Sequence, residues 1–139
     1  MGADLSNEVA LLKDAREHEF FVNAWIKDLG WCESRNKPHI KVMDSNDKYS
    51  YGYLQFQAET FMLYGKRYGI LDKDLEFGEV ENLIYDKDLQ IRIAERMLAD
   101  GLHNHWKNCY NKIYKVYPEY TIGAMQTMKE RFNATDRQR

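Results

Sequence analysis

The sequence predicts a mainly α-helical fold that contains a short β element. Three observations indicate this fold class. Apolar residues recur at helical spacing through most of the 139-residue chain, a glycine or proline ends several of these segments, and only one short stretch alternates as a β-strand does. No repeat, low-complexity tract or linker divides the chain, so we expect a single domain over residues 1–139.

The first half of the chain is predicted to hold a helical segment, a long loop and a short strand. Residues 6–30 place apolar side chains among charged ones, which is typical of one or two amphipathic helices. Residues 31–49 are rich in Asn, Lys, Asp and Ser, so a long loop is expected there. Tyr49, Tyr51 and Tyr53 then alternate with other residues, which predicts a short strand or hairpin edge.

The second half is predicted to be helical. The aromatic spacing after Gln57 predicts a helix that ends at Gly69, with the glycine in the left-handed conformation. Further helices are expected over about 88–99 and through 106–117, the first followed by a glycine and the second by a proline. Residues 120–139 could form a last helix with a polar, frayed end.

The composition excludes several classes of protein. Twenty Lys and Arg against 22 Asp and Glu give a net charge of −2, which argues against a nucleic-acid-binding protein. An aromatic content of 14% and only two prolines argue against disorder. No run of about 18 apolar residues occurs, so we expect no membrane span. The first residues show no signal peptide, and the two cysteines are too few for a disulfide scaffold.

Glu33 is the strongest candidate for a chemical role. It lies where the apolar helical segment meets the polar loop, between Cys32 and Ser34. Partial burial there would raise the pKa of its carboxyl, as a general acid that works near neutral pH requires. The position alone favours a solvated glutamate at a helix end, and the motifs that follow change this interpretation.

Four short motifs follow one another in the chain. They are Cys-Glu-Ser at 32–34, Tyr-Gly-Tyr-Leu-Gln-Phe at 51–56, Gln-Ile-Arg-Ile-Ala-Glu-Arg at 90–96 and Trp-Lys-Asn-Cys at 106–109. In this order they resemble the lysozyme-like superfamily of peptidoglycan-cleaving enzymes, and specifically the catalytic domain of resuscitation-promoting factors and lytic transglycosylases. The resemblance covers about residues 25–109 and implies a lysozyme-like α+β domain whose β element lies beside the active-site cleft.

The resemblance also implies roles for individual residues. Glu33 would act as general acid and then base in cutting the β-1,4 bond between MurNAc and GlcNAc. Gln55 matches a glutamine that lines the sugar site in the family, and Ser34, which completes the Glu-Ser pair, is expected to bind substrate. Tyr51 and Trp106 could stack on sugar rings, although aromatic residues at such spacing are more often part of a core. Tyr110 stands near the place of a family tyrosine, but the order of residues around it departs from the family's Tyr-Asn-Ala-Gly turn.

A second carboxylate would come from the loop before Gly52. Goose-type lysozymes carry aspartates there, and this chain has Asp44 and Asp47 in the corresponding loop. Either could orient water for hydrolysis. The stretch Asp-Ser-Asn-Asp is also typical of a turn, in which case both are turn residues.

Cys32 and Cys109 each stand beside a motif, and the resemblance implies a disulfide between them. A disulfide would indicate an oxidising compartment. We therefore expect an extracytoplasmic protein, whether periplasmic, on the cell surface or secreted, with any export signal or anchor outside this sequence. Two buried free thiols are the alternative.

The sequence therefore predicts a peptidoglycan-cleaving glycosidase, either a lytic transglycosylase or a lysozyme, that uses no cofactor and no metal. Peptidoglycan glycan strands would be its partner, and a monomer is expected. His103 and His105 are expected to be polar surface residues, because two positions apart they point to different faces of a helix. The alternatives are a catalytically silent domain that binds glycans or a cell surface, and a glycosidase acting on chitin or chitosan.

Overall fold

The fold is mainly helical, with a three-stranded antiparallel sheet, which confirms the predicted fold class. The computed structural model describes residues 19–137, with side chains described through residue 132. The described part of the first helix covers 19–34. The remaining elements are β1 (Lys41–Met43), β2 (Tyr49–Tyr51), β3 (Phe56–Gln57), α2 (Ala58–Arg67), η1 (Phe77–Glu79), α3 (Glu81–Ile84), α4 (Lys87–Ala99), η2 (His103–Trp106), α5 (Lys107–Val116) and α6 (Pro118–Arg137).

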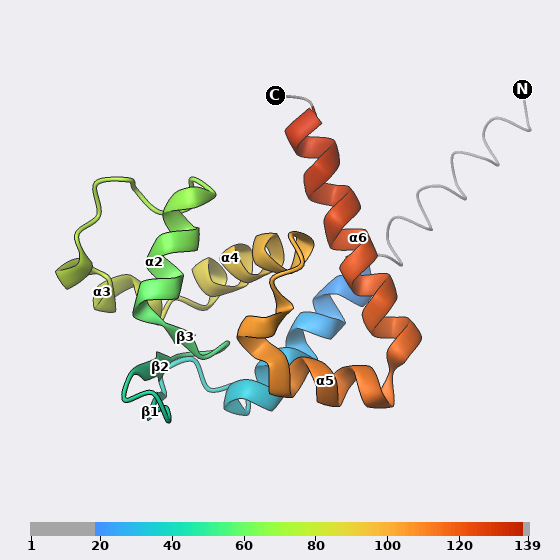
Figure 1. The fold of residues 1–139 in the computed structure, drawn as a ribbon, viewed down its shortest axis with the longest axis horizontal. Coiled ribbons are helices and arrows are strands. Elements are labelled where there is room, and N and C mark those ends of the chain that lie inside the picture. Colours follow the sequence, from blue (N-terminus) through green and yellow to red (C-terminus); the bar gives the residue numbers. More distant parts are fainter. Residues whose placement is uncertain (1–18, 138–139) are drawn as a thin grey trace, which may run out of the picture.

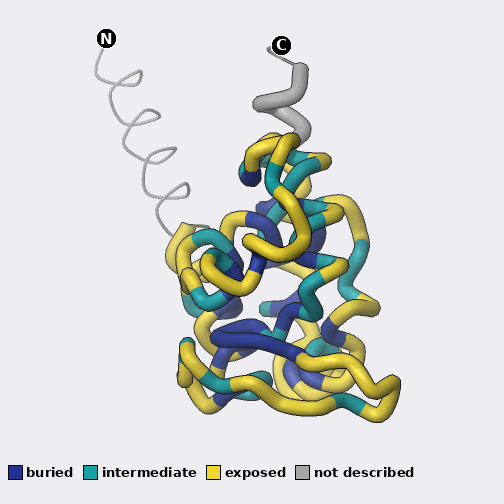
Figure 2. The backbone as a smooth tube through the Cα atoms, turned by 90° about the vertical axis from the view of Figure 1, so that its left-hand side faces the viewer, coloured by how far each residue is buried: buried dark blue, intermediate teal, exposed yellow. Residues whose placement is uncertain are grey.

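The helix α4 lies at the centre of the molecule (Figure 1). It packs against α2 and α3 on the side of the sheet and against α6 on the other side. Its N-cap, Asp86, accepts a hydrogen bond from the backbone N–H of Leu89, which satisfies one of the unpaired donors of the first turn. The apolar stripe of α4 is buried in the core, whereas β1 and the turn after it are exposed (Figure 2).

The sheet is a short meander in the order β1-β2-β3. β1 pairs antiparallel with β2, so that Val42 faces Ser50, and β2 pairs with β3, so that Tyr51 faces Phe56. Two neighbouring strands of a meander need only short connections. The β2–β3 connection is a tight turn over residues 52–55, and this turn forms one edge of the candidate site described below.

Two hydrogen bonds and a disulfide are among the contacts of long sequence separation that fasten the first helix to the C-terminal helices. Trp25, which is fully buried, donates a hydrogen bond from Nε1 to the Thr121 hydroxyl at 3.2 Å. The Tyr120 hydroxyl donates to the backbone carbonyl of Phe21 at 3.1 Å. The third contact is the disulfide between Cys32 and Cys109, with a Cα–Cα distance of 5.7 Å. The pairing implied by the resemblance is therefore present.

Most helices form where the sequence predicts them. Gly69 and Gly101 follow α2 and α4 with φ of 69° and 80°, as left-handed glycines that end helices. Three predictions need correction. The first helix continues to residue 34, β1 forms inside the predicted loop, and β2 ends at Tyr51, so that Tyr53 lies in the turn rather than in a strand.

The part of the predicted N-terminal helices before residue 19 and the end of the predicted tail lie outside the described residues. Within the described part of the chain, no helix combines the length and apolar character needed to cross a membrane.

Candidate functional site

Glu33 lies in the last turn of the first helix, directly before a sharp change in chain direction. Arg35 and Asn36 adopt left-handed conformations, with φ of 57° and 61°. Their backbone N–H groups donate to the carbonyls of Trp31 and Gly30, which caps the helix end. The disulfide at Cys32 fixes the same turn to the start of α5. Glu33 is therefore held on a rigid helix end.

Ser34 is predicted to bind substrate, but in the structure it is buried and does not line the cleft described below. Its side chain is 3% exposed, and its hydroxyl donates to the carbonyls of Gly30 at 3.0 Å and Tyr53 at 2.8 Å. It also accepts a hydrogen bond from the backbone N–H of Lys37. Ser34 thus ties the helix that carries Glu33 to the β2–β3 turn.

The β2–β3 turn is fixed from behind by Gln90, which is fully buried. Its Nε2 donates to the carbonyls of Tyr51 at 2.8 Å and Ile84 at 2.6 Å, and its Oε1 accepts from the N–H of Leu54 at 2.8 Å. Gly52 is required beside it, because φ is 75° and an added Cβ would lie 2.7 Å from Gln90 Nε2. The sequence placed Gln90 in a motif but gave no sign of these contacts.

Glu33 opens into a cleft of about 480 Å³ between the helix end, the sheet and the start of α5. Four of the predicted site residues line this cleft: Glu33, Asp44, Gln55 and Trp106. The other lining residues are Ser50, Phe56, Gln57, Thr60, Asn104, His105, Lys107, Asn108 and Cys109. Three separate parts of the chain thus contribute polar groups to one cavity.

The pKa of the Glu33 carboxyl is raised from 4.5 to about 7. Burial is the largest cause, because it disfavours the charged form, and the negative charge of Asp44 adds to it. The positive charge of Lys112 acts in the opposite direction. None of the described residues forms a hydrogen bond with the Glu33 carboxyl, so the acid is available to a bound molecule.

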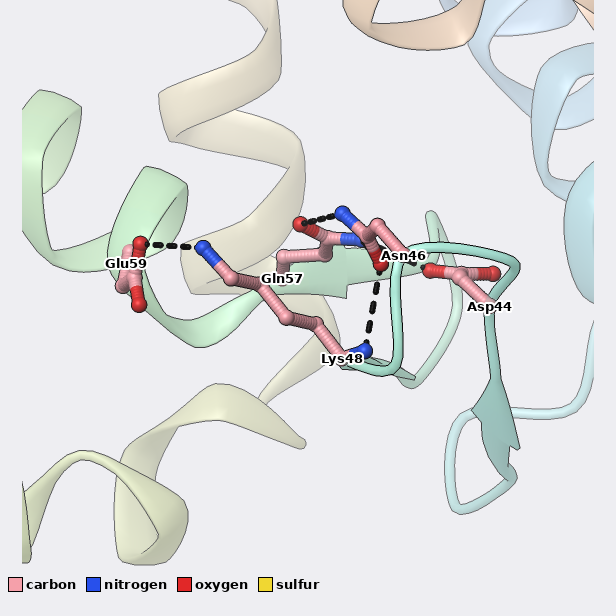
Figure 3. Close-up of polar contacts among 5 residues, drawn as sticks. All are labelled: Asp44, Asn46, Lys48, Gln57 and Glu59. Atoms are coloured by element: carbon pink, nitrogen blue, oxygen red, sulfur yellow. Dashed lines mark hydrogen bonds and ion pairs between the residues drawn. The ribbon is translucent and has the colours of Figure 1, made fainter.

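The two candidate aspartates differ in position. Asp44 lines the cleft, and its Oδ2 accepts hydrogen bonds from the Ser50 hydroxyl and, at 2.9 Å, from Gln57 Nε2. Asp47 is exposed in the β1–β2 turn with φ of 62° and does not line the cleft. Both aspartates belong to the turn, since the Asp47 N–H donates to the Asp44 carbonyl at 3.1 Å, and the side chain of Asp44 also points toward Gln57 (Figure 3).

Tyr51 and Tyr110 do not line the cleft, contrary to the prediction. Tyr51 is 6% exposed and donates its hydroxyl proton to Glu81 at 3.0 Å, on the side of the sheet that faces α3. Tyr110 stacks on His103, with ring centroids 4.3 Å apart, and meets the edge of Trp25. Both side chains are used in packing between elements.

Trp106 has a double role. It lines the cleft but is only 3% exposed, and its Nε1 donates to the carbonyl of Leu54 at 2.9 Å. Its ring packs edge-on against Phe56 at 5.3 Å. Trp106 therefore forms the floor of the cleft and holds the β2–β3 turn, rather than offering an open stacking face. Tyr49, by contrast, is 41% exposed, with the Lys41 ammonium 4.3 Å from its ring centroid.

Gln55 is the residue at the end of the turn, and it has an unusual backbone. Its φ is 55°, a left-handed conformation that is uncommon outside glycine. Its side-chain amide donates to the carbonyl of Gly52 at 2.9 Å. Residues held in such conformations cluster at functional sites.

The sequence did not identify several residues of this cleft. His105 is exposed, as expected of a surface residue, and it also lines the cleft, where partial burial lowers its pKa. Gln57, Lys107 and Asn108 also face the cavity. Asn108 and Lys107 belong to the Trp-Lys-Asn-Cys motif, which is the one signal that could have found them. Among the described residues, no three His, Cys, Asp or Glu side chains form a group that could hold a metal ion.

Comparisons of this chain with protein-family models, with curated proteins and with solved structures found no match.

Proposed function

We propose that this protein is a glycosidase that cuts the β-1,4 bond between MurNAc and GlcNAc in peptidoglycan, with Glu33 as the general acid. The observation that carries the proposal is the state of Glu33. It is a carboxyl with a pKa of about 7 at a rigid helix end, and it faces a polar cleft that also contains Asp44. Such a group is protonated near neutral pH and can donate that proton.

The two carboxyl groups have distinct environments, as acid and base in one reaction require. Burial keeps Glu33 neutral, so it can protonate the oxygen that leaves when the glycosidic bond breaks. Asp44 accepts two hydrogen bonds on one oxygen, which hold its side chain at the edge of the cleft. Its charge also stabilises the positive charge that develops on the sugar in the transition state.

The remaining lining supports a carbohydrate as the ligand. Uncharged polar side chains can exchange hydrogen bonds with hydroxyl and acetamido groups. The cleft has six of them: Ser50, Gln55, Gln57, Thr60, Asn104 and Asn108. Its volume of about 480 Å³ lies within the range of sites that bind small molecules or segments of a polymer.

The choice of peptidoglycan rather than chitin as the proposed substrate rests on the resemblance of the four motifs to the lysozyme-like enzymes. The Cys32–Cys109 disulfide supports an oxidising, extracytoplasmic location, where peptidoglycan is found.

The test is digestion of purified peptidoglycan with the wild-type protein and with Glu33→Gln, followed by mass spectrometry of the soluble muropeptides. Glu76→Gln is the matched control, because Glu76 is an exposed glutamate outside the cleft. Wild type and control should release muropeptides, and Glu33→Gln should release at least about 100-fold less. If no wall preparation is cut, the proposed glycosidase activity is excluded and a glycan-binding domain becomes the better explanation. If chitin is cut and peptidoglycan is not, the protein is a glycosidase but the proposed substrate is wrong.

A further inference from the structure

The hairpin that carries Asp44 contains a chain of side-chain hydrogen bonds that ends at the cleft. It links Asp44, Asn46 and Gln57, and Lys48 joins it through its backbone and reaches Glu59 through its side chain (Figure 3). Gln57 stands between the turn and the cleft, at the end of β3 and immediately before α2.

One group, the backbone N–H of Lys48, determines the donor and the acceptor in each of the hydrogen bonds that link Asn46, Gln57 and Asp44. The backbone N–H of Lys48 can only donate, and it donates to Asn46 Oδ1 at 3.1 Å. The amide nitrogen of Asn46 must then face the other way, and it donates to Gln57 Oε1 at 3.3 Å. The nitrogen of Gln57 is thereby directed to Asn46 Oδ1 at 3.2 Å and to Asp44 Oδ2 at 2.9 Å.

Asp44 is therefore held through one oxygen only. Oδ2 accepts hydrogen bonds from Gln57 and from the Ser50 hydroxyl. The backbone of Asp44 is fixed as well, because its N–H donates to the carbonyl of Lys48 at 2.8 Å. No described residue donates to Oδ1, and Asp44 lines the cleft.

We propose that Gln57 is a positioning residue that holds the Asp44 carboxylate in the cleft so that Oδ1 binds the water that attacks the sugar. The inference rests on the proposed function, and it predicts that the reaction is hydrolysis rather than the formation of an anhydro sugar. Gln57 acts through Asp44 and takes no proton itself.

The chemical step balances as a single displacement by water. Water attacks the anomeric carbon, one of its protons goes to Asp44, and the bond from the anomeric carbon to the glycosidic oxygen breaks. Glu33 gives its proton to that leaving oxygen. One water is consumed, one reducing end is formed, and solvent returns Glu33 and Asp44 to their starting states. Without a positioned water, a hydroxyl of the same sugar bonds to the anomeric carbon and gives its proton to the Glu33 carboxylate, so that an anhydro end forms and no water is consumed.

Gln57→Leu tests this proposal, because leucine fills a similar volume and cannot donate. In this variant kcat should fall about 10- to 100-fold with KM within about twofold, since the attacking water is misplaced while the sugar still binds. The share of anhydro ends among the products should rise. Azide, a small anion that needs no base, should restore part of the rate and yield a glycosyl azide. Reducing ends only, at the wild-type rate, would overturn the role of Gln57.

Two further variants separate positioning from general damage to the hairpin. Asn46→Ala removes an exposed side chain that orients the Gln57 amide, and it should show the same change in products to a smaller degree. Lys48→Met is the matched control. It keeps the backbone N–H that orients Asn46 and loses only the exposed ion pair with Glu59, so its kinetics and products should equal those of the wild type.

A measurement that needs no activity tests the positioning directly. The titration midpoint of the Glu33 carboxyl is followed by carbon-13 NMR in three proteins. They are the wild type, the single variant Asp44→Asn, and a double variant that carries both Gln57→Leu and Ser50→Ala. Asp44→Asn should lower the midpoint, because the Asp44 charge raises it. The double variant should lower it at least half as far, since the released carboxylate turns into solvent. An unchanged Glu33 midpoint in the double variant overturns the inference even if the wild-type protein cuts peptidoglycan. A lowered midpoint supports the positioning of Asp44 even if the wild-type protein cuts no peptidoglycan.

Discussion

Replacing Glu33 by glutamine is expected to stabilise the protein at alkaline pH and to leave its stability unchanged at acid pH. The pKa of Glu33 rises on folding, from an ordinary 4.5 to about 7. The folded state therefore binds the proton more tightly than the unfolded state. This contribution to stability is fully present below the unfolded pKa and is lost as the pH rises through the folded pKa. Glutamine has the same shape and no charge, so the stability of the variant does not fall as the pH rises through the pKa of Glu33.

The two pKa values set the magnitude of this effect. One pKa unit corresponds to about 1.4 kcal/mol, so the step from 4.5 to about 7 gives an upper limit of about 3 kcal/mol. Because Glu33 is only partly buried, solvent screening reduces this value, and we expect a gain of about 1–3 kcal/mol at about pH 8. For a chain of this size the gain corresponds to an increase in Tm of about 4–12 °C.

Urea unfolding followed by circular dichroism, at about pH 4 and about pH 8, measures this difference in free energy. Wild type, Glu33→Gln and the surface control Glu76→Gln are compared under the same conditions. The variant should gain stability only at the higher pH, while the control matches the wild type at both. A gain of equal size at both pH values, or none at the higher one, would refute a buried, neutral Glu33.

Three further predictions concern the supports of the site. Gln90→Leu leaves three buried backbone groups without their partner and should cost about 3–5 kcal/mol in urea unfolding; a loss below about 1 kcal/mol would mean that these hydrogen bonds contribute little. Reduction of Cys32–Cys109, which are 77 positions apart, should lower the free energy of unfolding by up to about 4–5 kcal/mol in a comparison with and without reductant, and equal stability would contradict this. Lys112→Met should raise the NMR titration midpoint of Glu33, because Lys112 lowers its pKa; a fall would show that the ammonium does not reach the carboxyl.

The sequence predicts helices well because their apolar stripes are continuous and a glycine or proline marks several of their ends. The predicted helices after Gln57 and before Pro118 both form, as α2 and α5. The strand β1 was missed because its three residues are all exposed and carry no alternation of buried and exposed side chains. The short helix α3 likewise has only four residues, too few for a helical period to appear.

For the candidate site, the sequence indicates which segments contribute but not where each side chain points. The motifs brought Glu33 and Gln55 to attention, and both line the cleft. Sequence could not separate Asp44 from Asp47, because the difference lies in which side chain turns toward Gln57 across the hairpin. The place of the Tyr51 ring could not be predicted for a similar reason, since the pleat of β2 decides which face of the sheet the ring occupies.

The most direct test of the central claim is the pH dependence of muropeptide release by the wild-type protein. If Glu33 is the general acid, the rate should fall as the pH rises through about 7, because the carboxyl must be protonated to donate. Glu33→Gln should show no such fall, because its residual release is low at every pH. A wild-type rate that stays constant well above pH 7, or no release at any pH, would contradict the assignment of Glu33 as the acid.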